Sequence, residues 1–454
     1  MRYIKSYNNT TDLRTDLAAG ELGHPYVAKI NNTIDFDSIS TNWENEYFTI
    51  IALTDGTISY SHKEGSNPMF YSINEGEWIE TTASVDIPVS KNNMIRFKSN
   101  RGSQAYNQET FTSGGTAQFA VAGNLMSLVA GDDFATYVPY TSATGTDGNL
   151  YCSFKNFFRN CKGLISAKNL IIKYCDNESF REFFNGCTNL LMPPELPATT
   201  LATNCYNRMF NNCTSLTVAP ELPATTLATY CYQGMFQGCK SLTTAPTLPA
   251  TDLTNYCYAT MFGGCTSLTT APALPATTLA QSCYQQMFYR CTSLTTAPAL
   301  PVTDLVNSCY KQMFQGCTSL TTVPELPATT LVMNCYYGMF RDCTSLTTVP
   351  SNLLPVTTLA IYCYKQMFQG CTSLTTAPEL PATTLVMNCY AYMFKGCTSL
   401  NYIKCLATDI SASSCTDSWV SGVASTGTFV KNPNMSSWAE GAIGIPTGWT
   451  VIDA

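Results

Sequence analysis

Cysteine is the residue type most able to do chemistry in this sequence, with 22 among 454 residues. A marker cysteine recurs every 26 residues, with one interval of 28, and in the last eight copies a second cysteine precedes it by eight residues. The marker cysteines are Cys161, Cys187, Cys213, Cys239, Cys265, Cys291, Cys317, Cys343, Cys371 and Cys397. Disulfide formation, zinc binding and soft-metal binding are the three kinds of chemistry that such a set offers.

The spacing of these cysteines favours packing over reactivity. Zinc sites need closely spaced cysteine pairs or nearby histidines, and the sequence has no Cys-x-x-Cys pair. Equivalent cysteines in a stack of repeats would form a ladder of small apolar side chains, so we expect buried thiols. Disulfides between repeats remain an alternative that depends on side-chain direction. A further alternative is that the stripe of methionine and cysteine side chains binds a soft metal ion. We predict no bound metal and no cofactor.

Other catalytic groups are sparse. His24 and His62 are the only histidines, and the sequence contains no GxSxG, HExxH, P-loop or dinucleotide-binding motif. Asp132 and Asp133 form an acidic pair, which we interpret as a turn before the repeats, with a cation site as the alternative. The sequence therefore predicts a protein that is not an enzyme.

Charge and hydropathy exclude two further classes of function. Charged residues make up 12% of the chain and the net charge is −7, but seven basic and seven acidic residues balance between Cys187 and Cys397. No basic stripe is evident in the sequence, so we expect no nucleic-acid binding. No stretch reaches transmembrane length, and MRYIKSYNNTTDLRTDLAAG lacks the apolar core of an export signal, so we expect no membrane insertion.

The repeat around Cys291 shows which element must position these residues. Two apolar rows with a stride of four indicate one face of a helix of about three turns. The rows contain Leu279, Cys283, Met287 and Cys291, and beside them Tyr284 and Phe288. Thr278 precedes them and is predicted to cap the helix. After Cys291, Ser-Leu-Thr-Thr-Ala suits a short strand that Pro298 ends, because proline has no amide to donate.

The patterns CxxLxxxPxxLP and LxxxCYxxMFxxC resemble the BspA-like leucine-rich repeat, found in surface proteins of anaerobic bacteria that live on mucosa. The resemblance covers roughly residues 150 to 405, although the family usually has AF where this chain has MF. It implies a solenoid of stacked repeats, with a parallel sheet along one side, and a role in adhesion or display.

The fold class predicted from these patterns is α+β. An N-terminal antiparallel β-sandwich is followed by a leucine-rich-repeat solenoid of about ten 26-residue repeats, each a strand plus a short helix, and by a C-terminal cap. Residues 1–45 form a small attachment or oligomerisation segment with a helix starting at Thr10 or Thr11, residues 46–122 the sandwich, 123–160 a linker and N-terminal cap, 161–400 the solenoid, and 401–454 the C-terminal cap. Trp419 and Trp449 are expected to cover the open end of the stack.

Sequence variation gathers on the predicted helix side of the repeats, which points to a binding surface. Six tyrosines there could stack on sugars or fill pockets of a partner: Tyr230, Tyr256, Tyr289, Tyr337, Tyr362 and Tyr392. Relaxed, solvent-exposed positions are the alternative interpretation. We expect weak, multivalent binding to a host-surface protein or glycan. If the protein is part of a virus particle, the N-terminal segment is expected to contact other virion proteins. A homo-oligomer is a further possibility.

Three functional hypotheses follow. The absence of an export signal favours a bacteriophage virion structural or fibre-type protein located on the virion surface. The repeat family favours an exported bacterial adhesin at the cell surface, and a purely structural spacer is the third hypothesis.

Overall fold

The structure is a computed structural model, and it divides the chain into two compact units, residues 1–198 and 199–454. The boundary falls inside the range predicted as the repeat array. The structure describes residues 4–7, 27–30, 33–35, 43–63, 66–99, 110–111, 115–135, 154–172, 174–435 and 438–454. The helix expected from Thr10 or Thr11 lies outside the described residues.

The first unit is built mainly of strands. β1 (Ile4–Tyr7), β2 (Val27–Ile30) and β3 (Thr33–Asp35) form one small sheet. Eight further strands are β4 (Phe48–Ala52), β5 (Gly56–Ser61), β6 (Met69–Ile73), β7 (Ile79–Thr81), β8 (Val85–Val89), β9 (Met94–Lys98), β10 (Thr110–Phe111) and β11 (Phe119–Asn124).

Two of the sheets in this unit share an aromatic core. β10, β5 and β8 form a three-stranded sheet, and β4, β6, β7, β9 and β11 belong to a six-stranded one. Phe111 of β10 lies 5.8 Å from Phe48 of β4 and 5.2 Å from Phe97 of β9, measured between ring centroids. All three phenylalanines are fully buried. These contacts fix β10 against the larger sheet.

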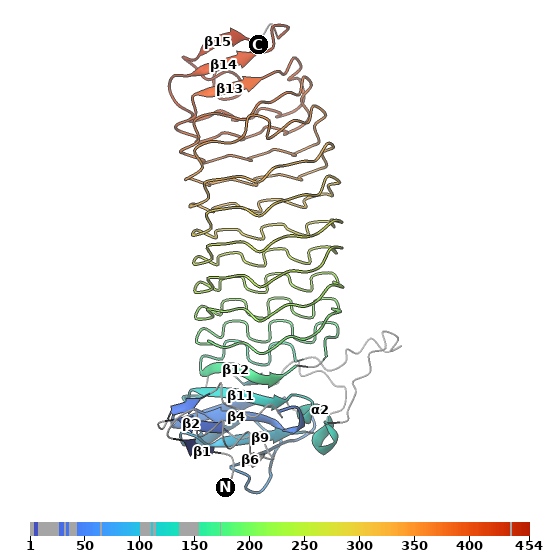
Figure 1. Cartoon of the computed structure of the whole chain (residues 1–454), viewed down its shortest axis with the longest axis vertical. Helices are drawn as coiled ribbons and strands as arrows, with labels where there is room; N and C mark the ends of the chain where they lie inside the picture. The colour runs from blue at the N-terminus through green and yellow to red at the C-terminus, as the bar shows by residue number, and fades with distance from the viewer. Residues whose placement is uncertain are drawn as a thin grey trace. The chain divides into compact units, whose positions relative to one another are not determined.

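The sixth strand of that sheet comes from the predicted repeat array. β12 (Leu164–Ile171) pairs in parallel with β11, and the sheet order is β12-β11-β4-β9-β6-β7 (Figure 1). On its other side, β12 continues to the next repeat, because Ser166 forms a parallel bridge with Met192. The strands β4 to β11, which we call the β-domain, therefore supply the hydrogen-bonding edge on which the first repeats of this unit build.

Helices are few in the described residues. α2 (Ser127–Ala130) is the one α-helix there, beside the short 3-10 helices η2 (Trp43–Asn45) and η3 (Gly131–Asp133). The helix predicted in each repeat does not form. The α+β class is therefore corrected to a repeat protein made mostly of strands and turns.

A chain of overlapping β-turns replaces the predicted helix. In the Cys291 repeat, every second amide donates to the carbonyl three residues before it, as Met287 does to Tyr284 at 3.1 Å. The amides between them donate to the next repeat, as Phe288 does to the Met313 carbonyl at 2.9 Å. An α-helix would instead bond each amide to the carbonyl four residues back. From Ser282 to Cys291 every backbone amide is thus satisfied, half of them by the neighbouring repeat.

Left-handed backbone at every fourth residue makes this arrangement possible. In the Cys291 repeat, φ is 53° at Ser282, 56° at Gln286 and 56° at Arg290. The same three positions, nine, five and one residue before the marker cysteine, have positive φ in the other repeats of the second unit. A helix cannot continue through such residues, and the short polar ones and glycine adopt them at least cost. The stride of four is thus a turn period.

Thr278 is consequently not a helix cap. It lies at a corner, where it forms a parallel bridge with Asp252 and its carbonyl accepts a hydrogen bond from the Leu253 amide at 3.1 Å. Its backbone therefore links neighbouring repeats instead of starting an element.

In the five repeats from Cys213 to Cys317, the predicted strand is reduced to single parallel bridges. Successive bridges join Val218 to Thr244, Thr244 to Thr270, Thr270 to Thr296 and Thr296 to Thr322. A proline follows each of the first four of these residues at a distance of two, so the ladder cannot extend in that direction.

Identical side chains stack in the interior of the second unit, where repeats lie above one another (Figure 1). Tyr284 stacks on Tyr310 at 5.9 Å and Phe288 on Phe314 at 5.6 Å, with rings nearly parallel. The 28-residue repeat keeps this spacing, because Tyr336 and Tyr364 are 6.0 Å apart. The two extra residues are taken up near Pro350, where Leu353 donates to the Pro350 carbonyl.

Three parallel strands and two tryptophans end the second unit. β13 (Tyr402–Cys405), β14 (Thr428–Lys431) and β15 (Thr450–Asp453) form the terminal sheet (Figure 1). Trp419 is fully buried, stacks on Tyr390 at 6.3 Å and donates from Nε1 to the Gly444 carbonyl. Trp449 is 7% exposed and donates to the Ala424 carbonyl. Trp419 therefore covers the last repeat, whereas Trp449 contacts residues of the cap itself.

Candidate functional site

The variable residues of the repeats lie on the surface formed by the overlapping β-turns. We call this surface the turn face and define it by the positions nine, six, five, two and one residue before each marker cysteine. In the Cys291 repeat these are Ser282, Gln285, Gln286, Tyr289 and Arg290, of which Ser282 is buried and the other four are half-buried or exposed. Three of the five positions are the left-handed ones. The turn chemistry therefore decides which positions are free to vary.

All six predicted tyrosines lie on the turn face and are half-buried. The structure brings some of them together. Tyr230 and Tyr256 stack on each other, with ring centroids 4.9 Å apart. Tyr362 and Tyr392 come from neighbouring repeats and flank one ammonium group, that of Lys365.

Tyr289 and Tyr337 are separate from these pairs, and each has a cation of its own. The Arg290 guanidinium lies 5.2 Å from the centre of the Tyr289 ring, and the Lys311 ammonium lies 5.3 Å from that of Tyr337. Sequence reasoning found the tyrosines but not their cations. The signal was the lysine or arginine that shares or adjoins each tyrosine position.

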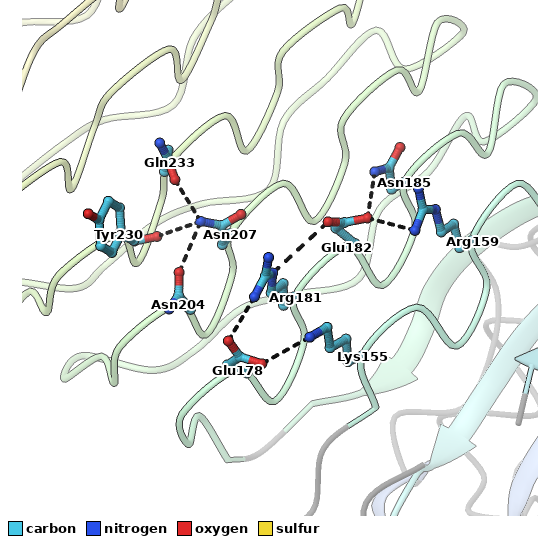
Figure 2. Close-up of polar contacts among 10 residues, drawn as sticks. All are labelled: Lys155, Arg159, Glu178, Arg181, Glu182, Asn185, Asn204, Asn207, Tyr230 and Gln233. Atoms are coloured by element: carbon cyan, nitrogen blue, oxygen red, sulfur yellow. Dashed lines mark hydrogen bonds and ion pairs between the residues drawn. The ribbon is translucent and has the colours of Figure 1, made fainter. Parts of the chain in front are cut away.

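In the first unit the turn face carries ion pairs (Figure 2). Glu178 accepts from Lys155 at 3.1 Å and from Arg181 at 2.8 Å. Burial alone would raise the pKa of Glu178, but these two cations outweigh it and lower the pKa. Glu182 pairs with Arg159 at 3.1 Å. Charge on this part of the face is satisfied internally.

In the second unit, the turn face begins with amides (Figure 2). Asn207 donates from Nδ2 to Asn204 at 3.1 Å and to Gln233 of the next repeat at 2.9 Å. Further along, Gln286 donates to Gln312 at 3.2 Å. These ladders hold neighbouring side chains in register.

The balanced charge of the array hides a separation that the structure makes visible. Between residues 199 and 397, all basic residues except Lys240 lie on the turn face: Arg208, Arg290, Lys311, Arg341, Lys365 and Lys395. All acidic residues except Asp342 lie in the proline corner, which we define as the segment from Pro298 to Asp304 and its equivalents: Glu221, Asp252, Asp304, Glu325 and Glu379. The turn face of this unit is therefore basic, which corrects the expectation that no basic stripe exists.

The predicted core ladder is removed from solvent and from chemistry. Leu279 is 7% exposed, Tyr284 2%, and the side chains of Cys283, Met287, Phe288 and Cys291 are fully buried. The Cys291 thiol donates to the Phe262 carbonyl of the preceding repeat at 3.1 Å, and Cys317 does the same to Phe288.

Burial also suppresses the ionisation of these thiols. It raises the pKa of the Cys239, Cys257 and Cys317 thiols to about 12. The thiolate is the nucleophile and the metal ligand, so burial disfavours both kinds of chemistry at these cysteines. The Cys239 and Cys317 thiols instead donate to the Phe210 and Phe288 carbonyls.

Asp132 is occupied by neighbours in the first unit. It accepts from Lys98 Nζ at 2.8 Å and from the Tyr47 hydroxyl at 2.7 Å, and the hydrogen bond from Lys98 is the main cause that lowers its pKa. The Lys98 ammonium also lies 4.5 Å from the centre of the Trp78 ring. This cluster of Tyr47, Trp78, Lys98 and Asp132 was not found from the sequence. Its carboxylate serves an ion pair, so the acidic pair is not arranged as a cation site.

Within the described residues, no group of three or more histidine, cysteine, aspartate or glutamate side chains could hold a metal ion. In the same part of the chain, no helix has the length and apolar character needed to span a membrane.

Comparison with known proteins gives one family. The model for the BspA type leucine rich repeat region matches in six copies, over residues 155–295, 234–367 and 281–418. These ranges together cover more than half of the chain. No curated protein and no solved structure matches this chain.

Proposed function

Because the chain belongs to the BspA-type leucine-rich repeat family, whose members are typically surface or extracellular proteins, we propose that it is a non-enzymatic adhesion and display protein. It binds a host or mucosal surface through the turn face of its repeats. The observation that carries this proposal is the contrast between an interior that repeats without change and a turn face that varies. Packing constrains the first, whereas the second is available for recognition.

The turn face suits weak binding that gains strength from number. Its half-buried tyrosines and its cations recur along the stack and belong to different repeats. Repeated sites on one rigid support raise the effective concentration for each further contact, so avidity exceeds single-site affinity.

Within this function, the finer proposal is a bacteriophage virion protein of the fibre or decoration type. The order along the chain of a small N-terminal sheet, a β-domain and a repeat array supports it, since this order provides separate segments for attachment and for display. An exported bacterial adhesin is the alternative. Fractionation of the native producer distinguishes them: the virion proposal expects the protein in purified particles, and recovery in cell-surface fractions alone contradicts it.

A block deletion tests the binding role of the array. Residues 311–336 return as residues 365–390 with a single difference, Val323 against Ala377. Removal of residues 317–370 therefore joins two nearly identical junctions, and we expect a folded protein that adheres less strongly to a mucin-coated surface.

The control for the deletion is Trp78→Ala in the β-domain, which leaves every repeat intact. We expect it to keep adhesion unchanged. If Trp78→Ala abolishes adhesion and the deletion does not weaken it, the array is a spacer and the β-domain is the binding part.

A further inference from the structure

Cation and tyrosine pairs cluster in the later repeats of the second unit. Arg290 lies over Tyr289 at 5.2 Å, Lys311 over Tyr337 at 5.3 Å, and Lys395 over Tyr392 at 5.3 Å. Tyr230 and Tyr256, stacked in earlier repeats, differ, because none of the cations in the described residues is found over either ring. The later repeats therefore combine positive charge with aromatic surface, and the earlier pair offers aromatic surface alone.

Lys365 has the best-defined position of these cations. Its ammonium lies 5.1 Å from the Tyr362 ring centre and 5.7 Å from that of Tyr392 in the next repeat. It donates to Asn388 Oδ1 at 3.1 Å, which uses one of its three N–H donors. Tyr392 is itself held by its hydroxyl, which donates to Asp417 at 2.6 Å. The ammonium is thus fixed between two rings with donors left to bind a ligand.

These lysines are not neutralised by the protein. Within the described part of the chain, none of Lys311, Lys365 and Lys395 forms an ion pair, whereas Lys404 pairs with Glu379 and Lys431 with Asp453. A cation beside half-buried aromatic rings is screened less than one in open solvent. Such groups attract an anion.

A lysine and tyrosine pair is present at both copies of the duplicated stretch, residues 311–336 and residues 365–390. Lys311 and Lys365 are equivalent residues of the two copies, but their tyrosines follow the copied stretch and occupy different positions, Tyr337 six and Tyr392 five residues before the marker cysteine. Each tyrosine nevertheless lies within 6 Å of its lysine. The two sites are two repeats apart, about 10 Å at strand spacing. A ligand that extends along the stack would meet both.

An acidic saccharide fits this surface better than a nucleic acid does. Tyrosine rings offer an apolar face to the C–H side of a sugar ring and a polar edge to its hydroxyls. Lysine supplies point charges for carboxylate or sulfate groups. One cation per repeat of about 5 Å is too sparse for duplex DNA, which carries a charge about every 1.7 Å.

We propose that the surface of Lys311, Tyr337, Tyr362, Lys365, Tyr392 and Lys395 binds acidic glycans, whose carboxylate or sulfate groups contact the lysines while sugar rings contact the tyrosines. This inference rests on the proposed adhesive function and names the ligand class of its turn face.

The experiment measures binding of the full chain to immobilised oligosaccharides: a sialylated one, its desialylated counterpart, and a sulfated one. A single-stranded oligonucleotide serves as a polyanion without sugar carboxylates or sulfates. We expect binding to the sialylated or the sulfated probe, which identifies the anionic group, and weakening when salt rises from about 0.05 M to about 0.5 M. Binding to the desialylated probe as strong as to the better of the two acidic probes, or preference for the oligonucleotide, overturns the proposal.

The matched variants are Lys365→Gln and Lys240→Gln, which remove the same charge at a pair site and at an exposed position outside the turn face. We expect Lys365→Gln to weaken binding about tenfold, the loss of one charge-assisted hydrogen bond, and Lys240→Gln to leave it unchanged. Tyr362→Ala tests the aromatic contribution. If both lysine variants weaken binding equally, the effect is net charge and the assigned site is wrong.

Failure of this inference can be told apart from failure of the adhesive function. If the block deletion weakens adhesion to mucin while Lys365→Gln and Tyr362→Ala do not, the array binds by another part of its turn face. If the block deletion leaves adhesion unchanged and the two substitutions leave glycan binding unchanged, both proposals are wrong.

Discussion

Gln285 and Gln286 are adjacent residues of the same type whose replacement by glycine tests the turn architecture directly. Both side chains are half-buried on the turn face. Gln286 has φ of 56°, whereas Gln285 is not among the left-handed residues. In a helix the two substitutions would cost about the same, roughly 1 kcal/mol each. In the turn chain they must differ.

The expected difference follows from three contributions. Glycine at position 285 gains nothing and lowers the free energy of unfolding by about 0.5 to 1 kcal/mol through backbone entropy. Glycine at position 286 carries the same entropic cost but relieves left-handed strain worth about 1 to 2 kcal/mol. It also loses the hydrogen bond from Gln286 to Gln312 at 3.2 Å, worth about 0.5 kcal/mol at a half-buried site. Gln286→Gly should therefore be near neutral, about 1 kcal/mol more stable than Gln285→Gly.

Urea unfolding of the two variants, followed by circular dichroism and by tryptophan fluorescence, provides the measurement. Glycine already occupies the position equivalent to 286 in two other repeats, at Gly234 and Gly338 with φ of 59° and 60°. Equal loss of stability in both variants would refute the turn chain and restore the helix. A larger loss for Gln286→Gly would mean that the amide ladder outweighs backbone strain.

Three further predictions concern the interior and the cap. Met287→Ala should lower the free energy of unfolding by about 3 kcal/mol, because its side chain is fully buried and leaves a cavity, while Gln285→Ala should change it by less than about 0.5 kcal/mol; equal midpoints in urea would contradict the assigned interior. Burial raises the pKa of the Cys239 thiol to about 12, so the unfolded chain, with thiol pKa near 8.5, loses its protons first. The stability that this thiol contributes is complete below about pH 8.5 and is lost as pH rises toward about 12. Urea unfolding midpoints should therefore decrease between about pH 7 and about pH 10. Rapid labelling of the native protein by a thiol reagent at about pH 8 would contradict the burial of the thiol. Trp419→Ala should cost about 3 to 5 kcal/mol and unfold the cap before the repeats, seen as early loss of hydrogen-exchange protection in β14.

The sequence predicted the interior well because repetition amplifies a weak signal. Leu279, Cys283, Met287 and Cys291 are all buried, as are Tyr284 and Phe288 of the second row, whereas Ala280 of that row is only partly buried. A side chain that recurs in every repeat must pack against its own copies. The backbone between those residues was misread. Apolar residues four apart fit a helix over one or two strides, but a helix with 3.6 residues per turn drifts by about 40° per stride, so about 120° over three. That drift disagrees with a helix. The structure shows left-handed residues at Ser282, Gln286 and Arg290, which form turns.

The binding surface was only half predictable for a physical reason. Aromatic residues at varied positions are visible in a sequence, so Tyr362 and Tyr392 were found. Their common partner Lys365 was not, because it lies 27 residues before Tyr392 and approaches that ring only when the two repeats stack. The balanced charge total concealed the separation of basic and acidic residues for the same reason. A sum along the chain contains no information on which face each charge occupies.

The two extra residues of the 28-residue repeat show where this architecture accepts foreign sequence. They enter beside Pro350, and the interior does not register them, because the Cys371 thiol still donates to the Phe340 carbonyl at 3.1 Å and Phe340 still stacks on Phe368 at 5.8 Å. A corner that absorbs an insertion without disturbing the stack is a graft site. Epitopes or enzyme tags placed between Pro350 and Leu353 would be displayed on a scaffold whose length can be set in whole repeats. The protein could then serve as a molecular ruler that carries a payload at a chosen height.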